Sequence, residues 1–268
     1  MDFAKWQGLG NDYLVIERDA LPRPLTPARA ALLCDRHFGV GGDGILEVSD
    51  DDGTPRMTVW NPDGSQAENC GNGIRMVARH LDAAGRLGDG RILTGGGPVA
   101  VVVREGGLVS VEMGAARFPA GEVREPLTAG GTTHQFAEVS MGNPHAIIGH
   151  ADPAAVVEID GPAIEVDPRF PERTNVEFVR RDGPDEITMR VWERGVGQTL
   201  ACGTGACAAA AAAVRLDGLE SPVTVHLLGG DLEVAVDDRL NVTMTGPAAL
   251  IYTGTLSPAL RAAYEETT

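Results

Sequence analysis

Cys70-Gly71-Asn72-Gly73 and Cys202-Gly203-Thr204-Gly205 present one pattern twice in a chain of 268 residues, at a separation of 202 − 70 = 132 positions. Each pattern leads through a Gly-x-Gly turn into a run of residues that predicts a helix, over 74–84 in the first case and over 206–214 in the second. A repeat at fixed spacing defines an architecture more firmly than any single motif does. The same separation should therefore recur elsewhere in the chain.

The separation of 132 positions does recur on both sides of the two cysteines. The matching pairs are Gly10-Asn11 with Gly142-Asn143, Asp43 with Asn175, Val59-Trp60 with Val191-Trp192, Asn61 with Glu193, and Met113-Gly114 with Thr245-Gly246. Chance similarity does not keep one register over so long a stretch. We therefore predict two pseudo-symmetric repeats, residues 1–116 with 248–268 folding back on them and residues 117–247, with the active site between them.

The residue patterns inside each repeat predict an α+β fold. Runs of alternating or β-branched residues indicate strands; they lie at 99–103, 109–113, 188–192, 223–227 and 232–236. Residues 27–36 are expected to form a surface helix, because Thr26 suits the N-cap and Pro27 the first helical position. Each repeat is expected to be a mostly antiparallel, barrel-like sheet wrapped around its central helix.

The predicted central helix of the second repeat has no polar face. Every residue from 206 to 214 is alanine except Cys207 and Val214. A helix that is apolar all round must be buried, so we expect strands to surround it. The first central helix carries Arg75, Arg79 and His80, and we expect it to be less completely enclosed.

Composition narrows the class of function. The formal net charge of −16 disfavours nucleic acid as a partner. No run approaches the roughly 18 apolar residues of a membrane span, and the start of the sequence lacks a basic segment followed by an apolar one. We expect a globular, cytoplasmic protein that does not bind membranes.

Four cysteines in such a chain favour free thiols over disulfides. Cys34 and Cys207 are interpreted as small buried apolar residues. Cys207 follows Cys202 by five positions, about 140° round a helix, so the two cannot share a metal ion. Lys5 is the only lysine, which disfavours a pyridoxal-phosphate enzyme because that cofactor needs a lysine Schiff base in its pocket. We expect neither a cofactor nor a metal.

Cys70 and Cys202 are predicted to stand where a helix begins. Unpaired backbone N–H groups and the positive end of the helix dipole stabilise an anion there, either a thiolate or a substrate carboxylate. Inverting an amino-acid Cα requires a proton to leave one face and another to arrive at the opposite face. Two thiols can do this, one as thiolate base and one as neutral acid. The pair therefore predicts a cofactor-independent amino-acid epimerase.

The sequence resembles the diaminopimelate epimerase family over almost its whole length. The motifs that carry the resemblance are Gly8-Leu9-Gly10-Asn11-Asp12, Asp35-Arg36-His37, Gly41-Gly42-Asp43-Gly44, Asn61-Pro62-Asp63-Gly64-Ser65, Cys70-Gly71-Asn72-Gly73-Ile74-Arg75, Met141-Gly142-Asn143-Pro144-His145, Arg173-Thr174-Asn175, Glu193-Arg194-Gly195 and Ala201-Cys202-Gly203-Thr204-Gly205-Ala206. The resemblance implies interconversion of LL- and meso-2,6-diaminopimelate in lysine and peptidoglycan precursor biosynthesis.

The resemblance also implies roles for individual residues. Cys70 and Cys202 would be the catalytic acid and base, with His145 and Glu193 tuning their protonation. The substrate contacts implied are Asn11, Asn61, Gly71, Asn72, Asn143, Asn175, Glu193, Arg194, Gly203 and Thr204. Members of the family are commonly homodimers, and Tyr252 lies where a dimer-contact tyrosine is found.

The sequence leaves alternatives open. Some relatives carry glutamine where this chain has Gly44, so a substrate contact at that position is in doubt. The same motifs could belong to a sibling racemase acting, for example, on histidine. A thiol-disulfide oxidoreductase is a further possibility, although the chain lacks a Cys-x-x-Cys motif. A binding protein without catalytic activity is the third.

Overall fold

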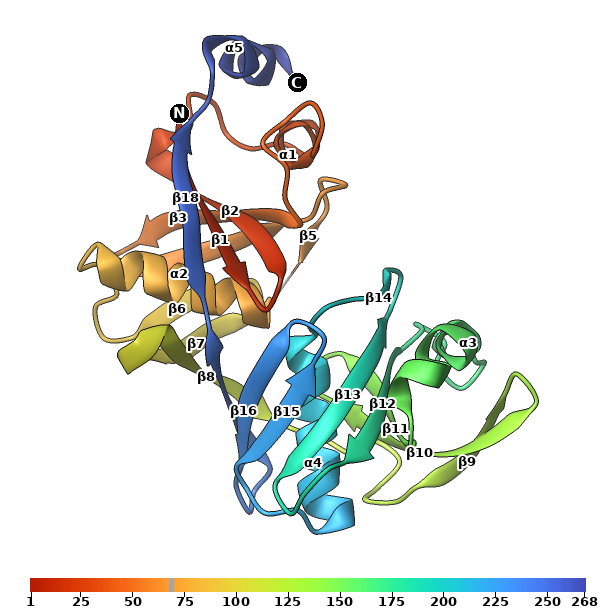
Figure 1. Cartoon of the computed structure of the whole chain (residues 1–268). Coiled ribbons are helices and arrows are strands. Elements are labelled where there is room, and N and C mark those ends of the chain that lie inside the picture. The colour runs from red at the N-terminus through yellow and green to blue at the C-terminus, as the bar shows by residue number, and fades with distance from the viewer. Residues whose placement is uncertain (68–69) are drawn as a thin grey trace. The chain divides into compact units, whose positions relative to one another are not determined.

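The computed structural model describes residues 1–67 and 70–268, and the chain divides into two compact units (Figure 1). The first unit comprises residues 1–111 and 246–268, and the second comprises residues 112–245. The described residues contain five α-helices and strands paired in both directions, so the fold is a mixed α+β fold.

The first unit contains three of these helices. Its elements are β1 (Asp2–Gly8), β2 (Asn11–Glu17), η1 (Arg18–Ala20), α1 (Pro27–Cys34), β3 (Gly44–Asp51), β4 (Thr54–Trp60), β5 (Gln66–Ala67), α2 (Gly71–Ala83), β6 (Arg91–Thr94), β7 (Gly97–Val103), η2 (Glu105–Gly107), β18 (Ala249–Thr255) and α5 (Pro258–Glu266). Strand β8 (Leu108–Ala115) begins in this unit and ends in the second. Pairing is mostly antiparallel, and β2–β3 and β4–β6 are parallel.

The second unit has the same mixture of antiparallel and parallel pairing. Its elements are β9 (Glu125–Ala129), β10 (Thr132–Ser140), β11 (Pro144–Gly149), α3 (Pro153–Glu165), β12 (Asn175–Arg181), β13 (Glu186–Glu193), β14 (Gly197–Gln198), α4 (Gly203–Asp217), β15 (Val223–Leu227), β16 (Gly230–Val236) and β17 (Asn241–Pro247). The parallel pairs are β11–β12 and β13–β15.

Helix α4 is the core of the second unit, as its alanines predicted. It packs against β10, β11, β12, β13, β15 and β16 (Figure 1). The side chains of residues 206–212 have no exposed surface. The helix extends beyond the predicted range at both ends, from Gly203 to Asp217, and stops at Gly218, whose φ of 66° is left-handed. A glycine at this position ends a helix without strain.

Helix α2 packs against strands β1, β2, β3, β4, β7 and β18 of the first unit. Arg79 and His80 are partly exposed, as expected. Arg75 is not: its side chain is fully buried. Burial is possible because the guanidinium finds neutral acceptors, with Nη2 donating to Asn72 Oδ1 at 2.9 Å and Nε to Pro247 O at 3.2 Å.

The predicted strands are all present, and the surface helix is confirmed with its cap. Thr26 Oγ1 accepts from Arg29 N at 3.3 Å, and α1 ends at Cys34, two residues before the predicted end. Helix α3 was not predicted, although Asp152 at its N-cap and Pro153 at its first position are a standard start signal. Among the described residues, no helix is long and apolar enough to cross a membrane.

Candidate active site

Cys70 and Cys202 are the N-caps of the two central helices. The helices begin at Gly71 and Gly203, three residues earlier than predicted, so the Gly-x-Gly pairs form the first helical turns. Cys70 Sγ accepts from Gly73 N at 3.2 Å, and Cys202 Sγ accepts from Gly205 N at 3.4 Å. Each sulfur therefore receives one of the backbone N–H groups that a helix start leaves unpaired.

The glycines serve packing at the two helix starts. Gly73 and Gly205 are helical, and neither has a positive φ. A Cβ at Gly73 would lie 2.7 Å from Leu46 Cδ2, and one at Gly205 would lie 2.5 Å from Glu177 Oε1. Glycine is needed because a strand residue approaches each helix start closely.

The residues around the first thiol form a group that we call the Cys70 cluster, comprising Asn11, Tyr13, Asp43, Cys70, Asn72 and Arg75. The Cys70 thiol donates to Tyr13 Oη at 3.6 Å. Asn72 Nδ2 donates to Asn11 Oδ1 at 3.3 Å. The other side-chain atom of Asn72, Oδ1, accepts from Arg75. Two predicted substrate contacts, Asn11 and Asn72, are thus held together beside one predicted catalytic cysteine.

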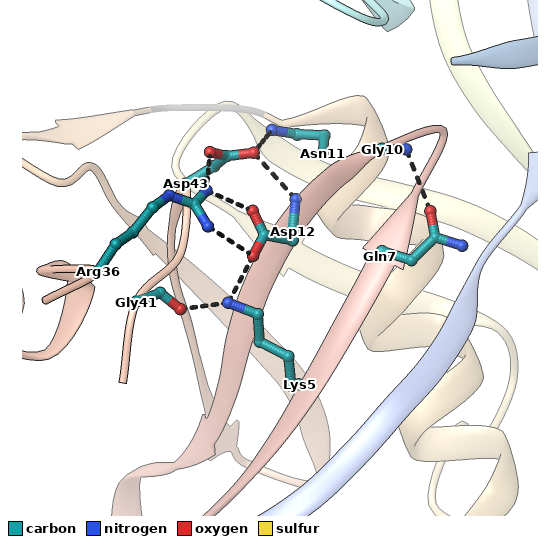
Figure 2. Close-up of polar contacts among 8 residues, drawn as sticks. All are labelled: Lys5, Gln7, Gly10, Asn11, Asp12, Arg36, Gly41 and Asp43. Atoms are coloured by element: carbon teal, nitrogen blue, oxygen red, sulfur yellow. Dashed lines mark hydrogen bonds and ion pairs between the residues drawn. The ribbon is translucent and has the colours of Figure 1, made fainter. Parts of the chain in front are cut away.

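A charged network behind Asn11 fixes its amide. Asn11 Nδ2 donates to Asp43 Oδ2 at 2.7 Å (Figure 2). Arg36 Nη2 lies 2.7 Å from both Asp43 Oδ1 and Asp12 Oδ1, and Lys5 Nζ lies 2.5 Å from Asp12 Oδ2. Burial acts to raise the pKa of Asp12, but hydrogen bonds from Arg36 and Lys5 outweigh it and hold that pKa below its ordinary value. The single lysine is therefore engaged in a buried ion pair.

The residues around the second thiol form the Cys202 cluster, comprising Asn143, His145, Glu177, Glu193, Thr199, Cys202 and Thr204. A chain of polar contacts crosses it. His145 Nε2 lies 3.0 Å from Asn143 Oδ1, and Asn143 Nδ2 donates to Thr204 Oγ1 at 3.4 Å. Thr204 Oγ1 lies 3.6 Å from Cys202 Sγ. His145, Asn143 and Thr204, all predicted site residues, thus converge on the second cysteine.

Two acidic side chains give this cluster a negative environment. Burial, followed by the charges of Glu193 and Glu177, raises the pKa of the Cys202 thiol well above its ordinary value. Burial also raises the pKa of Glu193, whose carboxylate accepts from Thr199 Oγ1. A raised pKa favours the neutral form, so Cys202 is a thiol in this environment.

The remaining predicted residues lie at turns and strand ends. Asn175 Oδ1 accepts from Arg194 N at 3.0 Å, and Asn175 Nδ2 donates to Pro144 O at 3.0 Å. Arg194 is exposed, and its Nη1 donates to Glu172 O at 3.2 Å. Asn61 Nδ2 donates to Ser65 Oγ at 2.9 Å, so this amide closes a turn. The backbone of Gly71 and Gly203 belongs to the first helical turns.

Gly44 is required by its neighbours. A Cβ at this residue would lie 2.5 Å from both Trp60 O and Tyr13 Cε1. A glutamine at position 44 would therefore displace the Tyr13 ring, which in this chain lies beside Cys70.

Sequence reasoning missed Tyr13, Asp43, Arg75, Glu177 and Thr199 as members of the clusters. The repeat contained a signal for Tyr13, because His145 minus 132 positions is Tyr13. Glu177 could not be found this way, because position 45 is isoleucine.

The other cysteines lie in the hydrophobic core. Cys34 and Cys207 are buried, as predicted, and burial raises the pKa of Cys34 to about 11. Within residues 1–67 and 70–268, no group of three or more His, Cys, Asp or Glu side chains is arranged to hold a metal ion.

Comparison with known proteins identifies the family. A model of diaminopimelate epimerase matches residues 3–119 and 137–251. The chain belongs to the diaminopimelate epimerase family. It is 45% identical to a diaminopimelate epimerase of Synechococcus sp. (strain JA-3-3Ab), with 95% of this chain and 98% of the relative covered. It is 41% identical to one of Burkholderia pseudomallei (strain K96243), with 96% and 98% covered. The resemblance inferred from the motifs is confirmed.

More distant solved structures share the fold of this diaminopimelate epimerase family member. A PhzF-family phenazine biosynthesis protein of Bacillus anthracis aligns with a TM-score of 0.72 at 17% identity, covering 96% of this chain and 99% of that protein. A probable proline racemase of Agrobacterium radiobacter K84 aligns with a TM-score of 0.70 at 15% identity, covering 97% and 95%. At these identities the likeness extends to the fold alone.

Proposed function

We propose that this chain interconverts LL-2,6-diaminopimelate and meso-2,6-diaminopimelate by proton transfer at Cα, with Cys70 and Cys202 as the acid/base pair. The observation that carries the proposal is that each thiol caps a buried helix and accepts a backbone N–H from its first turn. The product would serve lysine and peptidoglycan precursor biosynthesis. The family assignment supports this reaction.

The chemistry follows from the two helix starts. One thiolate takes the α-proton, and the electron pair of the Cα–H bond passes into the α-carboxylate. The other thiol then delivers a proton to the opposite face of the same carbon, and the roles reverse for the reverse reaction. The N–H groups of Gly71, Asn72, Gly203 and Thr204 suit a carboxylate whose negative charge grows during the reaction.

The side chains of both clusters provide substrate contacts in this proposal. Asn11 and Asn72 would bind polar groups near Cys70, and Asn143 with Thr204 would do so near Cys202. The exposed guanidinium of Arg194 can form the bidentate pair that a distal carboxylate requires. Asn61, Asn175 and Glu193 complete the proposed set.

The charges around the thiols support an order of protonation. The raised pKa of Cys202 favours its neutral form. The neutral Cys202 thiol is therefore the proton donor of the resting enzyme in this proposal.

We also propose that the two units arose from one duplicated unit with the boundaries predicted from the sequence. Strand registers support this idea: Tyr13 lies opposite Gly44, and His145 lies opposite Asn175. By this register Gly44, and not Asp43, corresponds to Asn175, so the repeat is offset by one residue in strand β3. The correspondence agrees with a substrate contact by glutamine at position 44 in relatives.

A homodimer is part of the proposal. Strand β18 exposes Leu250, Ile251 and Tyr252, with 45–50% of each residue accessible. Tyr252 also packs edge-on against Phe3. Exposed apolar side chains on a strand suit contact with a second copy of the chain. The reaction needs reduced thiols, which supports the expected cytoplasmic location.

Isotope exchange tests the proposal directly. The protein is incubated in deuterated water with LL-diaminopimelate, and Cα deuterium and the isomer ratio are measured. We expect meso product that carries deuterium at the inverted centre. A parallel incubation with L-histidine tests the sibling racemase, and disulfide exchange with a dithiol tests the oxidoreductase. Absence of deuterium from diaminopimelate would reject the proposed reaction.

A further inference from the structure

The Cys202 cluster contains a buried carboxylate for which the proposed reaction assigns no role. The side chains of Glu177 and His145 have no exposed surface, and Glu177 Oε1 lies 2.7 Å from His145 Nδ1. The other oxygen, Oε2, has no hydrogen-bond partner among the described residues. A buried carboxylate is costly even when it is paired. Its position beside a predicted catalytic imidazole therefore calls for an explanation other than stability.

The Cys70 cluster shows that packing does not require this carboxylate. By strand register, Leu46 on β3 corresponds to Glu177 on β12. Leu46 Cδ2 approaches the Gly73 position as Glu177 Oε1 approaches the Gly205 position. A methyl group thus fills the place beside one helix start, and a carboxylate fills the place beside the other.

The contacts of His145 orient its ring. The carboxylate of Glu177 is an acceptor, so the Nδ1 atom that lies 2.7 Å away donates to it. This contact turns Nε2 toward Asn143 Oδ1, 3.0 Å away.

The series of hydrogen bonds that begins at Glu177 extends to the Cys202 sulfur. With Oδ1 turned toward His145, Asn143 presents Nδ2 to Thr204 Oγ1 at 3.4 Å. Thr204 Oγ1 then accepts from Asn143, so its own hydrogen is free to point at Cys202 Sγ, 3.6 Å away. A hydroxyl hydrogen aimed at the sulfur stabilises thiolate.

We propose that Glu177 is a positioning residue that acts through His145 and Asn143 to direct the Thr204 hydroxyl hydrogen toward Cys202 Sγ, which enables Cys202 to act as a base. This role rests on the proposed function. It applies to the direction of reaction in which Cys202 removes the α-proton.

An effect of charge alone would have the opposite sign. The negative charge of Glu177 raises the pKa of the Cys202 thiol. If that were its whole effect, neutralising Glu177 would produce more thiolate and a faster base. The positioning role predicts slower proton removal by Cys202. The Glu177→Gln variant therefore distinguishes the positioning role from an effect of charge alone.

The test uses a reaction that needs one base only. From a β-halogenated analogue of diaminopimelate, thiolate removes the α-proton, the Cα–H electron pair forms the Cα=Cβ bond, and halide leaves with the Cβ–halogen pair. The LL and meso analogues present their protons to different thiolates. Cys70→Ser identifies the isomer that depends on Cys202, because only that isomer still eliminates halide.

In Glu177→Gln, elimination from the Cys202-dependent isomer should fall about 10- to 100-fold, the size of the loss when a metal-binding histidine loses the carboxylate that orients it. Elimination from the other isomer should stay within about two-fold of wild type. Thr204→Val should also slow elimination from the Cys202-dependent isomer, and the double variant should lose no more than Thr204→Val alone, because both changes break one chain of hydrogen bonds. Glu177→Asp, which keeps the charge but shortens the reach to Nδ1, should also be slow.

Glu47→Gln is the matched control, since it neutralises a buried glutamate outside both clusters. Equal losses for both isomers in Glu177→Gln would indicate a merely structural role and overturn the proposal, as would a faster Cys202-dependent elimination or losses that multiply in the double variant. If Glu177→Gln does not fold, Glu177→Asp carries the same comparison. Wild-type protein that eliminates halide from neither isomer would instead reject the proposed function.

Discussion

The Cys70 and Cys202 clusters share a backbone arrangement and differ in charge. In both, a cysteine caps a helix and accepts the N–H of the third helical residue. Tyr13 Oη lies 3.6 Å from the first sulfur, and the helix that this cysteine caps carries the buried Arg75. Around the second lie His145, Glu177 and Glu193. Main-chain geometry thus places the thiols, while burial and the carboxylates of neighbouring strands raise the pKa of Cys202.

This difference suits a reaction that needs one acid and one base at the same time. Two identical environments would leave both thiols in the same protonation state for much of the time. In the proposed reaction, burial and the carboxylates near Cys202 favour its neutral form and hence the mixed state. Substitutions in the two clusters test this difference between them.

The largest effect is expected from replacing either sulfur. Cys70→Ser and Cys202→Ser should each lower the epimerisation rate at least about 10³-fold, because serine is far too weak an acid for this proton transfer. Each variant should still eliminate halide from one isomer of the β-halogenated analogue, and the two isomers should differ. Cys34→Ala, which changes a buried structural cysteine, should keep epimerase activity. A serine variant that epimerises at the wild-type rate contradicts the assignment of that cysteine.

An intermediate effect is expected from making the Cys202 cluster less acidic. Burial is the main cause of the raised Cys202 pKa, and the Glu193 charge is the next. Glu193→Gln removes that charge, so the pKa should fall and thiolate should form at lower pH. We expect the midpoint of Cys202 alkylation by iodoacetamide, followed by peptide mass spectrometry, to shift down by about 1 pH unit. Glu138→Gln, a control on strand β10 outside the cluster, should leave the midpoint of Cys202 alkylation unchanged. An upward shift of the midpoint in Glu193→Gln would mean that the hydrogen bond between Glu193 and Cys202 outweighs the effect of the Glu193 charge.

The smallest effect is expected behind the Cys70 cluster. Asp43→Asn weakens the contact that orients the Asn11 amide, and loss of about 1 kcal/mol from such a bond raises KM about five-fold. The value of kcat should change less than about two-fold, because the proposed role of Asn11 is to bind substrate and not to transfer protons. Steady-state kinetics of Asp43→Asn and of Asp51→Asn, a surface control paired with Arg56, would test this. A selective fall in kcat would place Asn11 closer to the chemistry than we propose.

Sequence patterns predicted the features that depend on local chemistry. The alanine run of α4 could only be a buried helix, and the Cys-Gly-x-Gly pattern led to both helix starts. Contacts between distant strands carried no such signal. Arg75 was expected to be less enclosed because it is charged, and one of the acceptors that allow its burial, Pro247 O, lies 172 positions away in the sequence. In the sequence, Glu177 is an ordinary residue of a predicted strand. Only the folded structure shows that its carboxylate contacts His145.

Helix α4 also constrains how the second unit can vary. Its side chains from 206 to 212 are methyl groups and one thiol, all without exposed surface, so the surrounding strands approach the helix backbone itself. A larger residue would meet main chain that cannot rotate aside, and a glycine would leave a void. Its amide hydrogens should consequently be among the slowest in this unit to exchange with solvent, because releasing them requires the enclosing strands to separate.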